Sequence, residues 1–410
     1  MTEPETARPG PRPWRAPLRI AAITAVSAAG VGLAATRQAL RERRGGLVPC
    51  DLPDMPAGIW IGRVAAVESV RLPAALRAFD CRNNRLAELG LATDGFDAAV
   101  ARARARHGAG RIAVVLGTST AGIAETEAAW RRRDAEGRLP ADFDFAHTHD
   151  LHALSRYVRA RLGLAGPALT LSTACTSGAR AFLEARSLIE AGVADAAVVG
   201  GVDTLCRMTL HGFDALELLS RRPSRPCSAD RDGISIGEAA GFALLERMES
   251  GEEAALRLLG AGASSDGHHM SAPHPEGLGA VLAMRAALGA AGLEPGAIDY
   301  VNLHGTGTRA NDAMEDRAMS ALFGGRVPCS STKGWTGHTL GAAGALEAAV
   351  AAICIGDGLV PGCLGVAAVD PAFRSDVAVA NRRLPVRRVL SNSFGFGGSN
   401  AALVIGGHDA

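Results

Sequence analysis

Short apolar runs alternate with alanine-rich helical stretches along most of the chain, and this alternation limits the folds open to it. The runs that read as buried strands are 112–116, 196–199, 242–245, 255–259, 300–303 and 388–390. The stretches with helical spacing between them are 177–191, 278–291, 312–323 and 340–355. Strands that are apolar on both faces need helices on both sides of their sheet. The order therefore predicts an α/β fold with buried, mostly parallel strands.

The chain is long enough for two core-bearing units, because it has 410 residues whereas one domain usually takes ~100–200. A weak internal echo joins 172–192 (STACTSGARAFLEARSLIEAG) and 331–358 (STKGWTGHTLGAAGALEAAVAAICIGDG). Each segment opens with Ser-Thr, passes through a glycine turn and continues as an alanine-rich helix that ends in glycine. A duplicated half-domain fits this echo; a chance likeness of alanine and glycine is the alternative.

Composition excludes several classes of protein. Apolar residues make up 48% of the chain, which rules out intrinsic disorder. The net charge of +1 and the aromatic content of 4% argue against nucleic acid or a membrane surface as the main partner. Of the 43 lysine and arginine residues, one is a lysine, Lys333, and the others are arginines. Unless it is a chance survivor, it marks a place where a wide, planar guanidinium does not fit.

The eight cysteines contain no Cys-x-x-Cys pair and match neither zinc spacing nor a disulfide framework, so we expect reduced thiols in a cytoplasmic protein. Residues 1–17, rich in proline and arginine, read as a disordered leader. Residues 18–35 imitate a signal peptide, but they include Arg19 and two glycines and fall short of the ~20 apolar residues of a membrane span. A strand at 20–26, a glycine turn and a helix at 33–43 explain them better.

The first candidate functional residue is Cys175, in the segment TLSTACTSGARA. An apolar strand ends just before it and a helix begins just after it. Such an elbow exposes a side chain, and a helix N-terminus lowers the pKa of a thiol and offers amides to an oxyanion. We therefore expect Cys175 to be a nucleophile, the alternative being a small core cysteine.

Two further motifs supply histidines. His304 ends a β-run in YVNLHGTGTRANDAMED (300–316), and functional groups gather at the carboxyl ends of buried strands. His338 follows Lys333 in CSSTKGWTGHTLGAAGALE (329–347), which closes on Glu347 inside a long helix. A turn or capping role for either histidine is the alternative.

A glycine-rich loop, SNSFGFGGSN (391–400), carries Phe394 and Phe396. It suits a mobile gate over an apolar tunnel, or a tight turn with core phenylalanines. The chain contains no phosphate-binding loop, no His-Glu-x-x-His and no Gly-x-Gly-x-x-Gly between strand and helix. The adjacent histidines 268–269 lack the convergent ligands of a metal site.

Taken in order, Cys175, His304, Lys333, His338 and the GFGGSN loop resemble a β-ketoacyl-[acyl carrier protein] synthase of the elongating type. The resemblance runs from about residue 18 to 407. It implies the thiolase-like five-layer αβαβα fold built from two related halves, here 18–252 with the cysteine and 253–410 with the histidines, lysine and gating loop. Chain-starting and chalcone-synthase-like relatives pair cysteine with histidine and asparagine, so the second histidine favours the elongating type.

The resemblance also implies a mechanism. Cys175 would take an acyl group from a carrier-protein thioester and condense it with malonyl-carrier protein, which loses CO₂. Neutral His304 and His338 would hold the malonyl thioester oxygen. The backbone N–H groups of Cys175 and Phe396 would hold the tetrahedral oxyanion, and Phe394 and Phe396 would gate acyl access. No metal or redox cofactor is implied, since phosphopantetheine arrives on the carrier protein.

Supporting positions follow from the same resemblance. Lys333 would pair with a carboxylate such as Glu347 or Glu315. The loop GTSTAG (117–122) resembles the one whose side chain closes the acyl tunnel, with Thr120 at that position. The segment RDGISIGEAA (231–240) is similar to the family's RDGxxxGEGA. Just before it, Cys227 and Ser228 replace the usual Phe-Asp, a change that we expect to repack a loop only.

The expected partners are an acyl carrier protein and a second subunit, either a copy of this chain or a chain-length-factor-like paralogue. Family members dimerise through the strand after the nucleophile helix, here 196–199. Three arginines, Arg63, Arg82 and Arg85, would meet an acidic carrier protein or simply face solvent. The segments SSTKGWTGHTLGAAGALEA (330–348) and FDCRNNRLA (79–87) are similar to synthases of bacterial aryl-polyene pathways; general fatty-acid elongation is the alternative.

Two rival functions remain at this stage. A non-catalytic or chain-length-controlling subunit of a heterodimer would share the fold without turning over substrate. A coenzyme A-dependent thiolase would share the elbow cysteine but needs a second active cysteine near the C-terminus. The last cysteine is Cys363, and the final glycine-rich loop has none.

Overall fold

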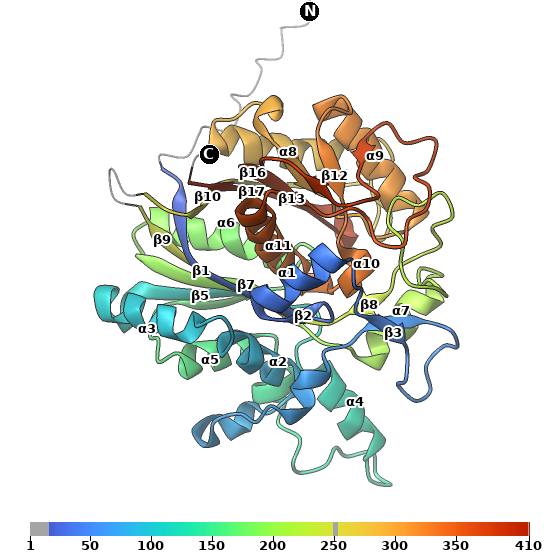
Figure 1. Cartoon of the computed structure of the whole chain (residues 1–410). Coiled ribbons are helices and arrows are strands. Elements are labelled where there is room, and N and C mark those ends of the chain that lie inside the picture. The colour runs from blue at the N-terminus through green and yellow to red at the C-terminus, as the bar shows by residue number, and fades with distance from the viewer. Residues whose placement is uncertain (1–15, 249–252, 409) are drawn as a thin grey trace, which may run out of the picture.

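The computed structural model describes residues 16–248, 253–408 and 410, and within them most of the strands belong to one long, mixed sheet (Figure 1). The predicted leader, 1–17, lies almost wholly outside these residues. The sheet runs in the order β14 (Asp376–Val377), β12 (Pro328–Ser330), β11 (Tyr300–Asn302), β16 (Arg388–Gly395), β17 (Ser399–Gly407), β10 (Leu256–Ser265), β1 (Leu18–Ser27), β9 (Ala239–Arg247), β7 (Ala196–Asp203), β5 (Ile112–Gly117) and β6 (Ala168–Leu171). The short strand β2 (Gly30–Val31) pairs with β1.

Two related runs of strands make up this sheet. Outward from β1 come β9, β7, β5 and β6, joined by two antiparallel and then two parallel pairings. Outward from β10 come β17, β16, β11 and β12 with the same sequence of directions. The runs meet where Leu18 pairs with Leu258. The prediction of mostly parallel strands is therefore wrong, because a strand buried on both faces is equally apolar in either direction.

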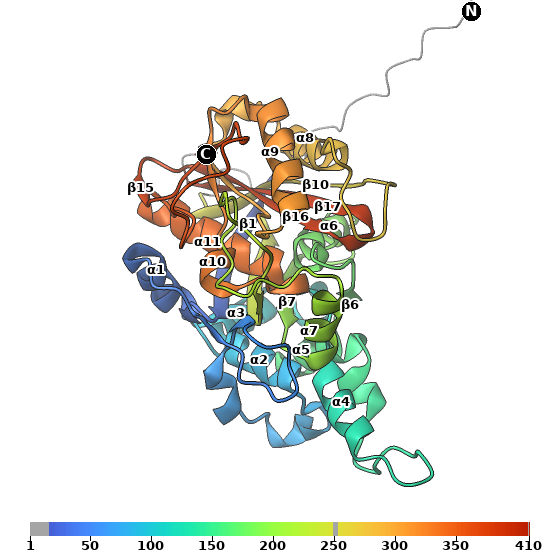
Figure 2. The same cartoon turned by 90° about the vertical axis from the view of Figure 1, so that its right-hand side faces the viewer.

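Helices add three layers to the two runs of strands (Figure 1). The central layer holds α6 (Ser177–Glu190) and α11 (Ala343–Asp357), which pack on each other. Outside the N-terminal run lie α2 (Arg82–Leu91), α3 (Phe96–His107) and α5 (His152–Arg161), and outside the C-terminal run lie α8 (Leu278–Ala291) and α9 (Arg309–Phe323). This is the expected αβαβα architecture. Figure 2, turned by 90°, keeps the C-terminal half above the N-terminal half.

The remaining elements connect these layers. The helices are α1 (Gly32–Glu42), α4 (Ile123–Arg131), α7 (Arg207–Ala215) and α10 (Lys333–Thr336), and the short strands are β3 (Leu47–Pro49), β4 (Trp60–Gly62), β8 (Ile236–Gly237), β13 (Leu359–Val360) and β15 (Arg382–Arg383). Of these strands, β3, β4 and β8 form a second small sheet and β13 and β15 a third. Single helical turns of other types are η1 (Ala65–Ser69), η2 (Ala74–Phe79), η3 (Ala109–Arg111), η4 (Phe145–His149), η5 (Pro295–Ala297), η6 (Leu340–Ala342) and η7 (Phe396–Gly398).

Small residues let the central helices approach closely. A Cβ on Gly178 of α6 would lie 2.6 Å from the carbonyl oxygen of Gly341, and a Cβ on Gly344 of α11 would lie 2.7 Å from Ala179. These contacts explain why both helices are rich in alanine and glycine, because larger side chains would force the two halves apart. The echo between 172–192 and 331–358 thus belongs to the two helices that share the central layer.

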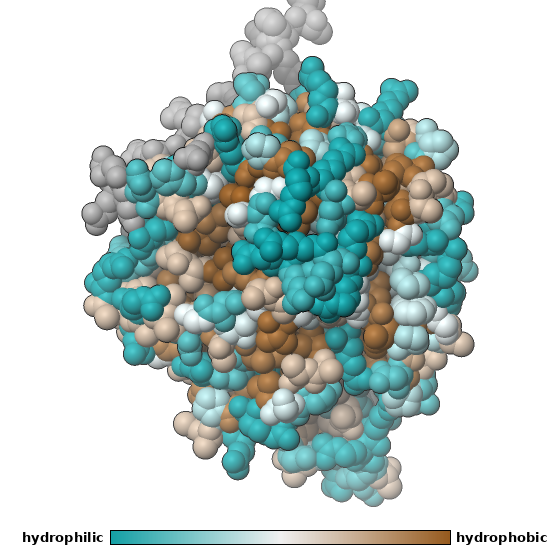
Figure 3. Space-filling view, viewed as in Figure 1, coloured by the Kyte–Doolittle hydropathy of each residue, from teal (hydrophilic) through white to brown (hydrophobic). Residues whose placement is uncertain are grey.

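Two apolar segments resemble membrane spans, residues 18–35 and Leu340–Asp357, and both are part of the folded protein. The run that imitates a signal peptide folds as β1, a turn and α1, as expected. In the part of the chain that the structure describes, one helical segment, Leu340–Asp357, is long and apolar enough to cross a membrane, but 78% of it is buried inside the protein. It is the central helix α11 with the turn before it. Hydrophilic and hydrophobic residues are interspersed on the face shown in Figure 3.

The strand expected to pair with a second subunit is an interior strand. β7 contains 196–199 and is hydrogen-bonded to β5 on one side and β9 on the other. The end of the N-terminal run is β6, before the nucleophile helix rather than after it. Its Leu169 is 37% exposed. The prediction for 196–199 is therefore wrong, since a strand with both edges paired has no free backbone groups for a partner.

Candidate active site

Cys175 sits in a strained elbow between β6 and α6. Ala174 just before it has a left-handed backbone, with φ of 52°. Ser177, the first residue of α6, fixes the elbow, since its hydroxyl donates to the carbonyl of Ala174 at 2.6 Å and accepts from the N–H of Thr173 at 2.9 Å. A non-glycine residue in this conformation costs about 1–3 kcal/mol. The surrounding structure holds that strain in order to present the sulfur of Cys175.

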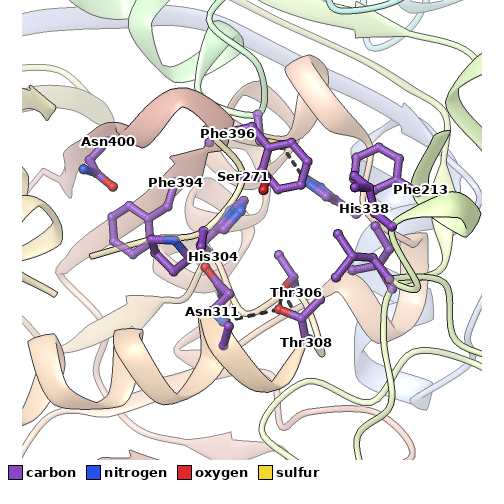
Figure 4. Close-up of a pocket in the computed structure, with 18 of the residues that line it drawn as sticks. Phe213, Ser271, His304, Thr306, Thr308, Asn311, His338, Phe394, Phe396 and Asn400 are labelled. Atoms are coloured by element: carbon purple, nitrogen blue, oxygen red, sulfur yellow. Dashed lines mark hydrogen bonds between the residues drawn. The ribbon is translucent and has the colours of Figure 1, made fainter. Parts of the chain in front are cut away.

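Both predicted histidines lie beside this sulfur, and Figure 4 shows their rings at the same pocket. His338 Nε2 lies 3.0 Å from Cys175 Sγ. The ring of His304 is edge-on to that of His338, with 5.2 Å between centroids. One potential ligand atom from each of the three residues falls within 4.8 Å of the others, close enough to bind a soft metal ion in principle. The three residues come from distant parts of the chain, as predicted.

A buried carboxylate orders the turn that carries His304. Glu315, in the second turn of α9, accepts the backbone N–H of His304 at 2.8 Å and of Gly305 at 2.7 Å. Asn392 of β16 donates to the same carboxylate at 3.1 Å. Burial raises the pKa of Glu315 to about 7, although the hydrogen bonds from these three donors lower it in part. Glu315 is thus the support of the His304 turn and not the partner of Lys333.

Lys333 is buried behind the histidines, with 1% of its surface exposed. Its Nζ donates to Glu347 of α11 at 2.5 Å and to the backbone carbonyl of His304 at 2.5 Å. Of the two carboxylates considered from sequence, Glu347 is therefore its partner. Burial raises the pKa of Glu347 to about 7, and Lys333 opposes that rise.

The electrostatics favour neutral imidazoles. Burial, together with the positive charge of Lys333, holds the pKa of both His304 and His338 well below the ordinary value. Both rings are therefore neutral at neutral pH, in agreement with the prediction.

Burial of Cys175 opposes the expected thiolate. Burial raises the pKa of the thiol to about 12, Lys333 lowers it in part, and the carboxylate of Asp203 raises it further. The prediction that the helix N-terminus produces a resting thiolate is wrong, because desolvation of the anion outweighs the helix terminus and the nearby amine. The thiol lies 3.0 Å from Nε2 of the neutral His338, within hydrogen-bonding distance of it.

Two cavities meet at Cys175. The first, of about 250 Å³, has His304 and His338 on its wall and includes the polar side chains of Thr306, Thr308 and Asn311. Figure 4 shows these three opposite the two phenylalanines of the glycine-rich loop. The second, of about 430 Å³, is mostly apolar and has no histidine on its wall; its lining includes Ser119, Leu216 and Leu340.

Phe396 separates the two cavities. It lines both, and its ring packs on Phe213 with 5.6 Å between centroids. Phe394 lines the first cavity and packs against His304 at 5.7 Å. The loop also touches the elbow, since a Cβ on Gly395 would lie 3.1 Å from the amide nitrogen of Cys175. The predicted gate and oxyanion positions are therefore adjacent to the sulfur.

Thr120 does not lie on the wall of either cavity. Its side chain is buried, its hydroxyl donates to Asp203 at 2.6 Å, and it accepts the N–H of Thr204 at 3.1 Å. Its neighbour Ser119 lines the second cavity instead. In a loop with alternating orientation a shift of one position reverses which side chain faces the cavity, and sequence likeness alone did not resolve that shift.

Other residues singled out from sequence serve the loops around the site. Cys227 has φ of 64° and donates its N–H to Asp312 at 2.8 Å. Arg231 is buried and bonds Asp370 at 2.7 Å. The three arginines proposed to meet a carrier protein are paired within the chain, as Arg63–Asp51, Arg82–Glu238 and Arg85–Asp80.

Several residues of the site were missed. Asn392 lies in the glycine-rich segment 391–400. The sequence analysis interpreted that segment through Phe394 and Phe396 and gave Asn392 no role. Phe213 and Asp203 carry no local signal, because a phenylalanine in a helix and an aspartate at a strand end are common. Only the fold shows that they adjoin Cys175 or the loop beside it.

Comparisons with known proteins agree with this geometry. The model of the β-ketoacyl synthase N-terminal domain matches residues 89–251, and that of the C-terminal domain matches 256–367. A 3-oxoacyl-[acyl-carrier-protein] synthase 2 of Rhizobium meliloti is 38% identical over 310 residues, 71% of this chain and 73% of that protein. The mitochondrial 3-oxoacyl-[acyl-carrier-protein] synthase of Arabidopsis thaliana is 41% identical over 269 residues, 61% of this chain and 58% of its own length.

Solved structures extend the likeness to almost the whole chain. A structure of the ketosynthase ApeO in complex with its chain length factor ApeC, from Xenorhabdus doucetiae, superposes with a TM-score of 0.88 at 39% identity. The match covers 95% of this chain and 98% of that one. The ishigamide ketosynthase/chain length factor gives a TM-score of 0.86 at 26% identity, over 95% and 99% of the two chains. Cysteine, two histidines and buried lysine thus stand in a thiolase-like ketosynthase fold, and the chain belongs to the β-ketoacyl synthase family.

Proposed function

We propose that Cys175 carries the growing acyl chain and that His304 and His338 activate malonyl-carrier protein for the condensation. The contact of 3.0 Å between Cys175 Sγ and His338 Nε2 carries this proposal. A neutral imidazole at that distance can accept the thiol proton as the sulfur attacks a thioester. The enzyme is an acyltransferase, and the roles below assign its chemistry to residues.

The first half-reaction loads the chain. Cys175 Sγ attacks the carbonyl carbon of acyl-carrier protein, and its proton passes to His338 Nε2. The bond between carbon and the carrier thiol breaks, and that thiol leaves with the proton. The mostly apolar second cavity would receive the chain, since it adjoins the sulfur and offers little to a polar group.

The second half-reaction extends it. Malonyl-carrier protein would enter the first cavity. Once the sulfur is acylated and no longer donates to His338, both neutral imidazoles, as tautomers that carry a proton on Nε2, donate to the malonyl thioester oxygen as CO₂ leaves. The electrons of the broken bond form an enolate, whose carbon attacks the acyl group on Cys175. Amides of Cys175 and Phe396 would hold the resulting oxyanion. The carbon–sulfur bond then breaks, and the cysteine thiolate takes up a proton. No resident metal or redox group has a step in this scheme.

Glutamine and alanine at position 175 test it. Cys175→Ala should abolish condensation, because no sulfur remains to hold the chain. Cys175→Gln should retain malonyl decarboxylation, because its amide occupies the place of an acylated cysteine between the two histidines. Release of labelled CO₂ and formation of β-ketoacyl-carrier protein are measured separately. Cys50→Ala, a half-buried cysteine away from both cavities, is the matched control and should keep both activities. Condensation by Cys175→Ala would end the proposal.

The second subunit would sit along β6. This strand ends the sheet with a partly exposed apolar face, and the structures of ApeO and of the ishigamide ketosynthase are complexes with chain length factors. We propose a chain-length-factor-like paralogue as the partner and a polyene of the aryl-polyene type as the product. Fatty-acid elongation by a homodimer is the second candidate, favoured by the curated relatives. The eight free cysteines fit a reducing cytoplasm.

The rival functions find less support. A thiolase needs a second active cysteine, and among the residues lining the two cavities Cys175 is the sole one. A non-catalytic subunit would not need the buried Lys333, which donates to the backbone carbonyl of His304, or the placement of His304 beside Cys175.

A further inference from the structure

A buried carboxylate outside the proposed catalytic set anchors one wall of the second cavity. Asp203, the last residue of β7, is fully buried. Its Oδ1 accepts four hydrogen bonds from the loop after β5, from the hydroxyl of Thr118 at 2.9 Å, the N–H of Ser119 at 2.8 Å, and the N–H and hydroxyl of Thr120 at 2.7 and 2.6 Å. A single oxygen thus fixes three consecutive residues.

The other carboxylate oxygen faces the turn that follows His338. Asp203 Oδ2 has no hydrogen-bond partner among the described residues. A Cβ on Gly341 would lie 2.7 Å from this oxygen and 2.9 Å from the hydroxyl of Ser119. The loop 118–120 is therefore held between a carboxylate and a close-packed glycine. Its remaining free side is the second cavity, which Ser119 lines beside Cys175.

We propose that Asp203 is a positioning residue for the acyl chain: by anchoring the loop 118–120 it keeps Ser119 on the wall of the second cavity and sets the chain length that fits beside Cys175. This inference rests on the proposed function, in which that cavity holds the acyl group. Asp203 touches no substrate in this account. It acts through the loop, in which the family resemblance had placed Thr120 as the side chain that closes the acyl tunnel.

The chemistry of the anchor explains why a carboxylate is kept in the core. Hydrogen bonds to an ionised acceptor are roughly twice as strong as those to a neutral one. Burial raises the pKa of Asp203, and the four donors on one oxygen oppose that rise in part. If the charge of Asp203 is removed, the hydrogen bonds that hold the loop 118–120 weaken. The space into which the loop can move is the second cavity. The loop should then relax into the cavity and shorten it.

The test compares acetyl- and octanoyl-carrier protein as donors to Cys175. In Asp203→Asn we expect kcat/KM for octanoyl transfer to fall about tenfold relative to acetyl transfer, through KM, because the amide oxygen can still accept the four hydrogen bonds but without the charge that strengthens them. Thr120→Val, which removes one donor, should move the same ratio in the same direction. Thr120→Ser, which restores a hydroxyl, should return it to the wild-type value. Asp195→Asn, on a carboxylate just before the other end of β7 that pairs with Arg111, should leave it unchanged.

The outcomes separate the two proposals. General destabilisation would lower transfer of both chains alike and leave their ratio as in the wild type. A wild-type ratio in soluble Asp203→Asn, or the same ratio in Thr120→Val and Thr120→Ser if Asp203→Asn does not fold, overturns the inference. Failure of the wild type to become acylated on Cys175 by either donor overturns the proposed function instead.

Discussion

At the scale of single residues, burial decides the chemistry of the site. Cys175, His304, His338 and Lys333 are each less than 10% exposed. Burial makes the thiol and both imidazoles neutral, and it leaves the amine paired with Glu347. The identity of these residues was predictable from motif and resemblance. Their protonation was predictable only in part, because a helix terminus is visible in sequence and desolvation is not.

The lone lysine gives a prediction at this scale. Lys333→Arg should lower condensation by about 100-fold or more, since a guanidinium cannot replace an amine that donates to two oxygens at 2.5 Å, and a misplaced buried charge costs several kcal/mol. Turnover and thermal unfolding are measured together. Arg382→Lys, in an exposed pair with Asp376, is the reciprocal control and should change stability by less than about 1 kcal/mol. Near wild-type turnover of Lys333→Arg would show that the lysine is an accident.

At the scale of elements, the sequence identified most strands and helices but not their neighbours. The helix expected at 278–291 is α8 with the same bounds, and the run 112–116 lies in β5. The assignment of 196–199 to a subunit interface failed because interior and edge strands share the same apolar composition. The order of the strands depends on the packing of the long connections between them. The sequence of β7 itself does not indicate which strands will be its neighbours.

The edge strand can be tested by disrupting its exposed side chain. Leu169→Asp on β6 should weaken association with the second subunit by at least about tenfold, because a carboxylate would be buried without a partner there. Light scattering after size exclusion, over a range of concentrations, reports the mass against the 42.1 kDa of one chain. Val379→Asp, equally exposed but in the C-terminal half, should not change it. An unaltered two-chain particle with Leu169→Asp would place the interface elsewhere.

At the scale of the whole molecule, the site exists because two related halves meet. The N-terminal half supplies Cys175 from the elbow before α6. The C-terminal half supplies His304, Lys333 and His338 from turns beside β11 and α11. The echo between the two helices predicted this junction. An apolar tunnel beside the glycine-rich loop was expected, but its lining was not predictable, because the wall of the second cavity combines Ser119, Phe213 and Leu340 from three segments with no common motif.

The most direct measurement is the mass of the peptide containing Cys175 after incubation with acyl-carrier protein and no malonyl donor. The account predicts one acyl group on that cysteine, lost when malonyl-carrier protein is added, with β-ketoacyl-carrier protein appearing in equal amount. Product formed while the peptide stays unmodified, or an acyl group on another cysteine instead, would contradict it.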